Sequence, residues 1–289
     1  MNDYLLSLLL GVIEGLTEFL PVSSTAHLRI SEALFRIDLT NGFWKMYSIV
    51  IQLGAIIALT AFFWRRILRF LATFPRGESG DRIFWNHPLS LVAIAFVVTA
   101  IPAFLLTKLI GKNLENLEVM ALALLIGGIA MWIVDTLFVR PRVMQMEAMS
   151  LPAAIWIGAV QILSAVFPGT SRSMCTIAAG QVAGLSREAA LEFSFFLSIP
   201  TMFVATGYDL LKTIRPHAGT EAIAPLAMTP HLWLVLAIGF VVAFISAYAV
   251  VAWFLHWVRR HGFTPFAIYR IVLGLLLLLA LERGMLGRG

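Results

Sequence analysis

The chain has 289 residues, of which 60% are hydrophobic and only 13% are charged, with a formal net charge of +5. Soluble domains carry about 25% charged residues, so this chain lacks the polar side chains that would cover its core in water. The mean hydropathy of +0.89 points the same way. We therefore exclude a soluble globular protein and, for want of a soluble basic domain, a nucleic-acid partner. The single cysteine, Cys175, excludes an internal disulfide and a cysteine-only metal site.

The first apolar stretch belongs to a broken segment at residues 4–30 and is too short to cross a bilayer. A spanning helix needs roughly 20 apolar residues, whereas this stretch ends at Pro21 within a polar run. Its start lacks basic residues and no small-residue cleavage motif follows, so it does not read as a signal peptide. We expect this segment to enter and leave the membrane on one side.

Three longer apolar stretches follow the first broken segment, and three more follow a second broken segment at residues 151–186. All but the last, which is a little short, reach the length that a spanning helix needs. The predicted spans are residues 44–64, 89–109, 119–139, 191–211, 232–258 and 266–281. Asp135 lies close enough to the end of its span that we expect it to be solvated. The sequence therefore predicts an all-α, multi-pass membrane protein.

The two broken segments are similar to each other in sequence, which indicates an internal repeat. The identical pairs are Gly11 and Gly158, Leu16 and Leu163, Pro21 and Pro168, and Ser24 and Ser171. A Phe-Val-Val triplet also recurs late in each half, at residues 96–98 and 240–242. We expect two repeats, residues 1–147 and 148–289, each with one broken segment and three spans. An odd number of spans inverts the second repeat relative to the first, as in folds whose interrupted helices meet at mid-membrane.

Positive charge predicts the orientation of the chain. The loop from Arg65 to Arg82 contains five arginines, and cytoplasmic loops are enriched in lysine and arginine. This loop is therefore predicted to be cytoplasmic, which places both termini on the outer side.

Glu14 and Glu18 lie four residues apart in the first broken segment, so both project from one face of a helix. A carboxylate at membrane depth costs at least about 2.5 kcal/mol, and two neighbouring carboxylates also repel each other. A functional pair needs a proton, a cation or an arginine nearby. The alternative is a pair without a function at a wet helix end.

The run Pro21-Val-Ser-Ser-Thr-Ala-His27 directly follows this acidic pair. Proline ends the first helix, and serine or threonine is a preferred N-cap for the next. A helix N-terminus binds anions through its free N–H groups. The hydroxyls of Ser23, Ser24 and Thr25 and the imidazole of His27 are therefore predicted to gather at an anion site.

The run Pro168-Gly-Thr-Ser-Arg-Ser173 repeats this design and adds an arginine. Gly169 allows close approach of the backbone, the hydroxyls of Thr170, Ser171 and Ser173 can donate, and Arg172 can grip phosphate oxygens through two N–H groups. The alternative for Arg172 is a structural salt bridge to one of the two glutamates.

Assembled by the repeat symmetry, the two segments would supply a nucleophile, an acid or base, and positive charge. That set is suited to hydrolysis of a phosphoanhydride. Ser24 or His27 would attack phosphorus, and spacing does not choose between them. Glu18 would orient or deprotonate the nucleophile or its water.

At these residues the chain resembles the undecaprenyl-diphosphate phosphatase family, also called bacitracin-resistance proteins. The family motif E-x-x-x-E followed by P-V-S-S-T-x-H matches residues 14–18 and 21–27, and P-G-x-S-R-S-x-x-T matches residues 168–176. The segment at residues 50–56 also fits. Ala26 and Met174 stand where the family usually has glycine, and we expect them to alter the fit of the substrate.

The resemblance implies removal of the terminal phosphate from undecaprenyl diphosphate at the periplasmic face of the bacterial inner membrane. This reaction recycles the lipid carrier for peptidoglycan synthesis in cell wall biogenesis and confers resistance to the antibiotic bacitracin. The implied catalytic residues are Glu14, Glu18, Ser24, His27 and Arg172. The implied substrate-binding residues are Ser23, Thr25, Gly169, Thr170, Ser171, Ser173 and Thr176.

The resemblance also implies a divalent cation, Mg²⁺ or Ca²⁺, for which Glu14 and Glu18 are the only candidate ligands, and no organic cofactor. The expected partners are the polyprenyl diphosphate substrate and membrane lipids, and a homodimer is compatible with this scheme.

Two rival functions start from the same residues. A lipid-carrier transporter or flippase would share the inverted repeat and the phosphate-binding Arg172, but it has no use for Ser24 and His27 together. The other class of membrane lipid phosphatase uses a histidine nucleophile in an S-R-x-x-x-x-x-H pattern. After Ser171-Arg172 this chain has no histidine until His217, so it does not match that class.

Overall fold

The computed structural model describes residues 2–37, 42–77, 80, 82–106, 116–214 and 228–284. This part of the chain is helical, which confirms the all-α prediction. The α-helices are α1 (Asp3–Thr17), α2 (Ser24–Leu34), α3 (Gly42–Thr73), α4 (Pro88–Leu105), α6 (Leu117–Leu137), α7 (Leu151–Val166), α8 (Arg172–Val182), α9 (Arg187–Ile214), α10 (Pro230–Val258) and α11 (Thr264–Glu282). Two short 3-10 helices, η1 (Phe84–Asn86) and η2 (Met146–Ala148), precede α4 and α7.

Six of the described helices are long and apolar enough to cross a membrane, namely α3, α4, α6, α9, α10 and α11. The six predicted spans are therefore confirmed. The third element, α3, continues to Thr73, well beyond the predicted end at residue 64. Its extension contains Arg65, Arg66 and Arg69, and arginine is a good helix former, so the helix does not stop where the apolar stretch does. Residues 107–109 of the second predicted span lie outside the described part.

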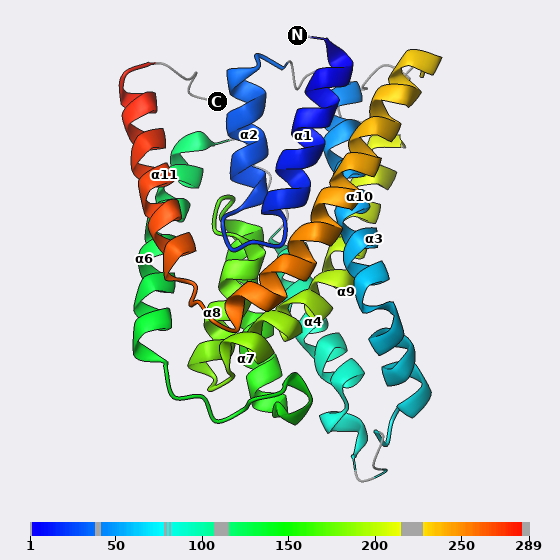
Figure 1. Cartoon of the computed structure of the whole chain (residues 1–289), viewed down its shortest axis with the longest axis vertical. Helices are drawn as coiled ribbons and strands as arrows, with labels where there is room; N and C mark the ends of the chain where they lie inside the picture. The colour runs from blue at the N-terminus through cyan, green and yellow to red at the C-terminus, as the bar shows by residue number, and fades with distance from the viewer. Residues whose placement is uncertain are drawn as a thin grey trace.

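The two broken segments each form a pair of short helices joined by a turn. Figure 1 shows α1 and α2 side by side in the upper half of the molecule and α7 and α8 in the lower half. The turns contain Pro21 and Pro168, and a proline bars a helix from continuing because it has no N–H to donate. The first pair thus leads from one end of the molecule toward its middle and back.

Glycines let the broken segments pack closely against the long helices. α1 lies along α10, and α7 lies along α4. A Cβ placed on Gly11 would be 2.8 Å from the carbonyl oxygen of Gly239, and one on Gly158 would be 2.4 Å from that of Ala95. Small residues at helix interfaces allow such close backbone approach in membrane proteins.

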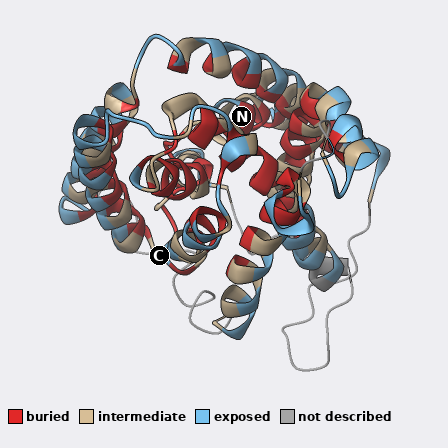
Figure 2. Cartoon of the chain, turned by 90° about the horizontal axis from the view of Figure 1, so that it is seen from below, coloured by how far each residue is buried: buried red, intermediate tan, exposed pale blue. Residues whose placement is uncertain are grey.

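The outside of the helix assembly is apolar. Figure 2 shows buried residues facing the interior and exposed residues on the periphery. Large apolar side chains such as Trp64, Ile126, Leu137, Val204 and Leu276 are each more than half exposed. Extended apolar surface of this kind is rare on soluble monomers and is typical of an interaction with membrane.

The expectation that Asp135 is solvated is wrong, because its side chain is buried. One carboxylate oxygen accepts a hydrogen bond from Nε of Arg187 at 2.7 Å, and the other accepts from the backbone N–H groups of Phe263 and Thr264. The free N–H groups at the start of α11 provide the partners that water would otherwise supply.

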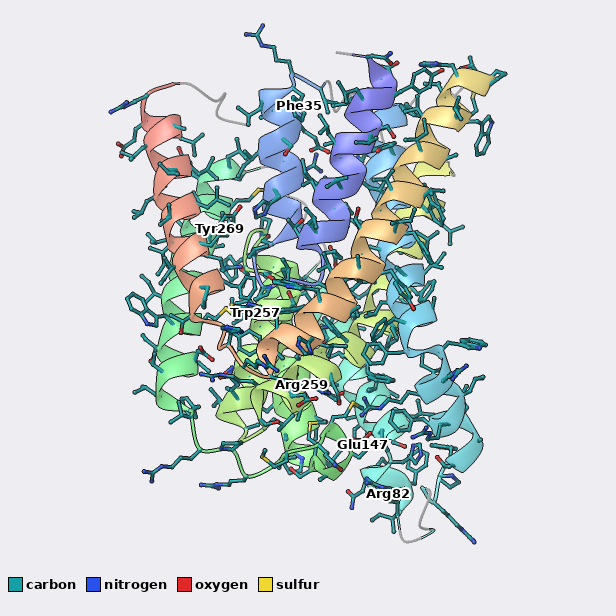
Figure 3. All side chains as sticks on the ribbon, viewed as in Figure 1. Phe35, Arg82, Glu147, Trp257, Arg259 and Tyr269 are labelled. Carbon is teal, nitrogen blue, oxygen red and sulfur yellow. The ribbon has the colours of Figure 1, made fainter. Side chains whose placement is uncertain are left out.

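A second, partly exposed cluster of charged side chains links three elements at the lower end of the molecule. Arg66 on α3 pairs with Glu147 of η2 at 2.5 Å and with Glu192 of α9 at 2.9 Å. Figure 3 shows Arg82, Glu147 and Arg259 at this end, far from Phe35 at the other.

We predict that Gly158→Ala destabilises the fold by about 1–3 kcal/mol, as overpacking does, because its Cβ would be 2.4 Å from the Ala95 oxygen. The measurement is the thermal unfolding midpoint of the protein in detergent. The control is Gly207→Ala in α9, where an added Cβ meets nothing within 4 Å. Equal midpoints for the two variants would contradict the proposed close contact.

Candidate functional site

The first turn is built by residues that end one helix and begin another. α1 ends at Thr17, with Glu18 as its C-cap, and α2 begins at Ser24. Ser23 is the N-cap of α2, and its side chain accepts a hydrogen bond from the backbone N–H of Ala26. Its φ of +74° is in the left-handed region, which is strained for a residue other than glycine. The turn is therefore held in an uncommon conformation directly beside Ser24, one of the two candidate nucleophiles.

The second turn has the same construction. Ser171 is the N-cap of α8 with a φ of +71°, and its side chain accepts from the backbone N–H of Met174. Gly169 has a φ of +91°, and a Cβ there would be 2.7 Å from the carbonyl oxygen of Met120. Only glycine fits at this position, because both the backbone conformation and the space exclude a side chain.

The structure brings the two turns into direct contact. The Ser173 hydroxyl, at the start of α8, donates to the carbonyl oxygen of Leu20 in the first turn at 2.9 Å. Arg172 donates to the Glu18 carboxylate at 3.2 Å. The prediction that the two motifs meet is confirmed by these contacts between residues about 150 positions apart.

Glu18 lies at the centre of the arrangement. One of its oxygens accepts the hydrogen bond from Arg172, and the other accepts one from the Ser24 hydroxyl at 2.5 Å. Arg172 is largely buried, and its Nη1 has no hydrogen-bond partner among the described residues. This geometry places a carboxylate next to a hydroxyl that it can deprotonate, and leaves part of a guanidinium group available to an anion.

Glu14 is fully buried on α1, and neither of its carboxyl oxygens has a hydrogen-bond partner within the described residues. The Glu14 carboxyl group interacts electrostatically with Glu18, Glu32 and Arg172. A buried carboxyl group without a partner is costly and calls for a proton or a cation.

His27 is held in one tautomer. Its Nδ1 lies 2.7 Å from the carbonyl oxygen of Ser23, and its Nε2 lies 2.6 Å from the hydroxyl of Tyr269. Because a carbonyl oxygen can only accept, Nδ1 carries the proton. In the neutral ring Nε2 then accepts from Tyr269, and Figure 3 shows Tyr269 between α11 and α2. The rings of His27 and Tyr269 are also stacked, with centroids 5.6 Å apart.

Several predicted substrate-binding hydroxyls make contacts inside the protein. The Thr170 hydroxyl donates to the carbonyl oxygen of Phe167 at 2.7 Å. The hydroxyl of Thr176 pairs with that of Ser194 on α9 at 2.6 Å. The hydroxyls of Ser171 and Ser173 lie 3.0 Å apart, and Thr25 is half-buried on the first turn of α2.

The two departures from the family pattern lie behind the turns. Ala26 is fully buried in a cluster with Leu117, Met120 and Leu124. Met174 is also buried and belongs to the main hydrophobic core. Their side chains therefore fill the interior behind the site.

Two residues of α11 that the sequence analysis overlooked contact the site. Tyr269 bonds to His27, and Arg270 is fully buried with its guanidinium group between the two turns. A charged residue inside an apolar span is by itself a functional signal, so Arg270 could have been singled out from the sequence. Tyr269 carries no comparable signal, because tyrosine is common in spans.

The described residues contain no group of three or more His, Cys, Asp or Glu side chains that could hold a metal ion. The donor set at the site is limited to Glu14 and Glu18. Magnesium is often bound by one or two carboxylates together with substrate phosphates and water, and the partnerless carboxyl group of Glu14 fits that requirement.

Comparison with known proteins gives the family. The family model for bacitracin resistance protein BacA matches residues 7–276. Three similar curated relatives, each named undecaprenyl-diphosphatase, come from Koribacter versatilis, Caldanaerobacter subterraneus and Thermus thermophilus. The first is 64% identical over 96% of this chain and 98% of the relative. The second is 41% identical over 93% of each, and the third is 42% identical over 92% of this chain and 93% of the relative. The chain belongs to the bacitracin resistance protein BacA family.

Proposed function

We propose that this chain is an undecaprenyl-diphosphatase, which hydrolyses undecaprenyl diphosphate to undecaprenyl phosphate and inorganic phosphate. The observation that carries the proposal is the Glu18 carboxylate, which accepts hydrogen bonds from Ser24 and from Arg172 at once. This contact joins a nucleophile, its base and a phosphate-binding cation. The reaction would recycle the lipid carrier for peptidoglycan synthesis and would account for resistance to bacitracin.

In the proposed first step, Ser24 Oγ attacks the terminal phosphorus while Glu18 takes the hydroxyl proton. The bond between that phosphorus and the bridging oxygen breaks, so undecaprenyl phosphate leaves and a phosphoserine forms. Arg172 and the N-termini of α2 and α8 stabilise the charge on the transferring phosphoryl group, since preorganised donors lower the barrier most where charge develops. The short Ser24–Glu18 contact supports Ser24 over His27 as the nucleophile.

In the proposed second step, His27 activates the water that hydrolyses the phosphoserine. Its Nε2 is the unprotonated nitrogen, which supports a role as a base. The water oxygen bonds to phosphorus and gives a proton to Nε2 of His27. The bond between phosphorus and Ser24 Oγ breaks, Oγ takes back the proton that Glu18 removed in the first step, and inorganic phosphate is released. Tyr269, whose hydroxyl contacts Nε2 before the water binds, orients the imidazole.

Among the predicted substrate-binding residues, we propose that Ser23, Thr25, Gly169 and Ser171 contact the phosphates at the two turns. Thr170, Ser173 and Thr176 hold the turns in place, which their hydrogen bonds within the protein support.

We propose that a Mg²⁺ or Ca²⁺ ion, if bound, is held by Glu14 with Glu18 and the substrate. The partnerless, buried carboxyl group of Glu14 supports this assignment. The ion would neutralise negative charge on the diphosphate oxygens. No organic cofactor is part of the proposal.

We propose that the two halves, residues 1–147 and 148–289, are inverted repeats. Ser23 and Ser171 both cap a helix at positive φ, although Ser171 aligns with Ser24 in sequence, and this common construction supports the proposal. The matched glycines support it too, because Gly11 approaches α10 as Gly158 approaches α4. In the inner membrane, the lower end in Figure 3, with Arg82 and Arg259, would face the cytoplasm and the α1–α2 pair would enter from the periplasm. A homodimer stays a prediction.

The first test is phosphate release from undecaprenyl diphosphate by the detergent-purified protein. We expect Arg172→Ala to lower kcat by about 10³-fold, the upper range for loss of one transition-state donor. Arg187→Lys, remote from the site, serves as the control. A second arm with a chelator tests the cation. If the wild type binds the lipid but releases no phosphate, the phosphatase proposal fails and transport takes its place.

The identity of the nucleophile is tested with substrate labelled on the terminal phosphorus. We expect His27→Ala to accumulate an acid-stable label on Ser24, because the phosphoserine forms but its hydrolysis slows by about 10²-fold or more. Ser24→Ala should acquire no label. An acid-labile label that survives in Ser24→Ala would instead assign the nucleophile to His27.

Tyr269→Phe removes the hydroxyl that donates to His27 but keeps the stacked ring. We expect kcat to fall about 3–10-fold, because a single hydrogen bond contributes about 0.5–1.5 kcal/mol. Steady-state kinetics are compared with Tyr248→Phe, an exposed tyrosine on α10 away from His27. Equal rates for Tyr269→Phe and wild type would remove Tyr269 from the mechanism.

A further inference from the structure

Arg270 is the largest fully buried side chain of the described chain. We infer that Arg270 is a positioning residue, which holds the two turns at a fixed separation and thereby sets the contact of Glu18 with Ser24 and Arg172. The inference deepens the proposed function and rests on it for its kinetic consequence.

The guanidinium group of Arg270 contacts both turns at once. Its Nη1 donates to the carbonyl oxygen of Pro21 at 3.3 Å, and its Nη2 donates to that of Gly169 at 3.1 Å. Nη2 also donates to the carbonyl oxygen of Ala123 on α6 at 3.0 Å. Pro21 lies three residues before Ser24, and Gly169 lies three residues before Arg172. A rigid, planar group therefore ties the backbone just ahead of both reactive side chains to a spanning helix.

The charge of Arg270 is costly where it lies. An arginine within a span is costly because lipid does not solvate its charge, and among the described residues no carboxylate forms an ion pair with Arg270. Packing alone would be served equally well by an apolar side chain. The carbonyl contacts explain why an arginine stands here, since only its fork of N–H groups donates in several fixed directions.

The guanidinium group of Arg270 packs tightly against the surrounding helices. A Cβ on Gly127 of α6 would be 2.5 Å from Nη2 of Arg270. α6 and α11 cross closely here, because a Cβ on Gly274 would be 2.8 Å from the Ala121 oxygen. Ala123 and Arg270 occupy equivalent positions in the two halves, because they are separated by the same number of residues as Gly11 and Gly158. At this position the second half provides the donor, Arg270, and the first half provides the carbonyl acceptor, Ala123.

Arg270→Lys separates position from charge. Lysine keeps the positive charge near the site but lacks the planar fork, so it does not reach both turns at once. We expect kcat for phosphate release to fall about 10–100-fold with KM within about threefold, because a displacement of about 1 Å costs about 10²-fold in rate. The matched control is Arg187→Lys, which alters the ion pair with the buried Asp135 at the lower end and should lower the unfolding midpoint while kcat stays within about twofold.

Gly127→Ala is the second variant and keeps Arg270 itself. Its added Cβ pushes on the guanidinium group, so the same loss of kcat at near-constant KM is expected. Its control is Gly207→Ala, which has free space around the new Cβ. This pair keeps the inference testable if Arg270→Lys does not fold.

The separation of the turns is measured directly, without substrate. Nitroxide labels are placed at Leu16→Cys and Phe167→Cys, exposed positions next to the two turns, in a Cys175→Ala background. We expect the EPR distance distribution to be narrow in the otherwise unchanged protein and in Arg187→Lys, and broad or shifted in Arg270→Lys.

A broadened distribution together with the loss of kcat supports the inference. Unchanged distances overturn it, whether or not kcat falls. Broadened distances with unchanged kcat also overturn it, because the separation would then be irrelevant to the reaction. If the wild type releases no phosphate, the proposed function fails, and the EPR distances alone decide whether Arg270 positions the turns.

Discussion

The carboxylate of Glu18 is the contact on which the site depends, because it is shared between two turns that are far apart in the sequence. One oxygen accepts from Ser24 of its own turn and the other from Arg172 of the second. In a buried setting such charge-assisted bonds are strong. Under the proposed mechanism, the hydroxyl, the base and the phosphate-binding arginine are therefore aligned before a substrate arrives, which is the condition for electrostatic catalysis. Remaining contacts between the turns serve to keep this alignment.

Breaking a helix is how this fold brings polar groups to the middle of an apolar protein. A continuous helix satisfies its own N–H and C=O groups, and only its ends offer free ones. Pro21 and Pro168 create such ends in the interior, where the carbonyl oxygens of the turns accept from Ser173 and Arg270. The buried charge of Asp135, at the lower end, instead has partners within the protein. Its carboxylate accepts hydrogen bonds from Arg187 and from the backbone N–H of Phe263 at the start of α11. Under the proposed function, Glu18 and Arg172 at the turns take part in the reaction and Arg270 positions them, whereas the charges at the lower end stabilise the fold.

Prediction from the sequence identified the six spans and the two broken segments from signals within a few residues, and the meeting of their motifs from the internal repeat. Apolar length predicts a span, proline predicts a break, and serine predicts a cap. It was wrong about Asp135, whose partners come from α9 and the start of α11. It overlooked Arg270 and Tyr269, and it did not anticipate that the Thr176 hydroxyl bonds to Ser194 of α9. These contacts join separate helices, and those of Asp135, Tyr269 and Arg270 join helices that are distant in the chain.

By itself, the sequence determined the class of protein, the helices and their breaks, and the chemical groups that stand at each break. Only the tertiary structure decided which distant partner each group has: Arg172 for Glu18, Tyr269 for His27, and the carbonyl oxygens of both turns for Arg270. The physical reason is one of range. Hydropathy, helix capping and proline act along the backbone over a few residues, whereas a side-chain hydrogen bond requires an atom within about 3 Å, and close packing of distant helices alone provides it.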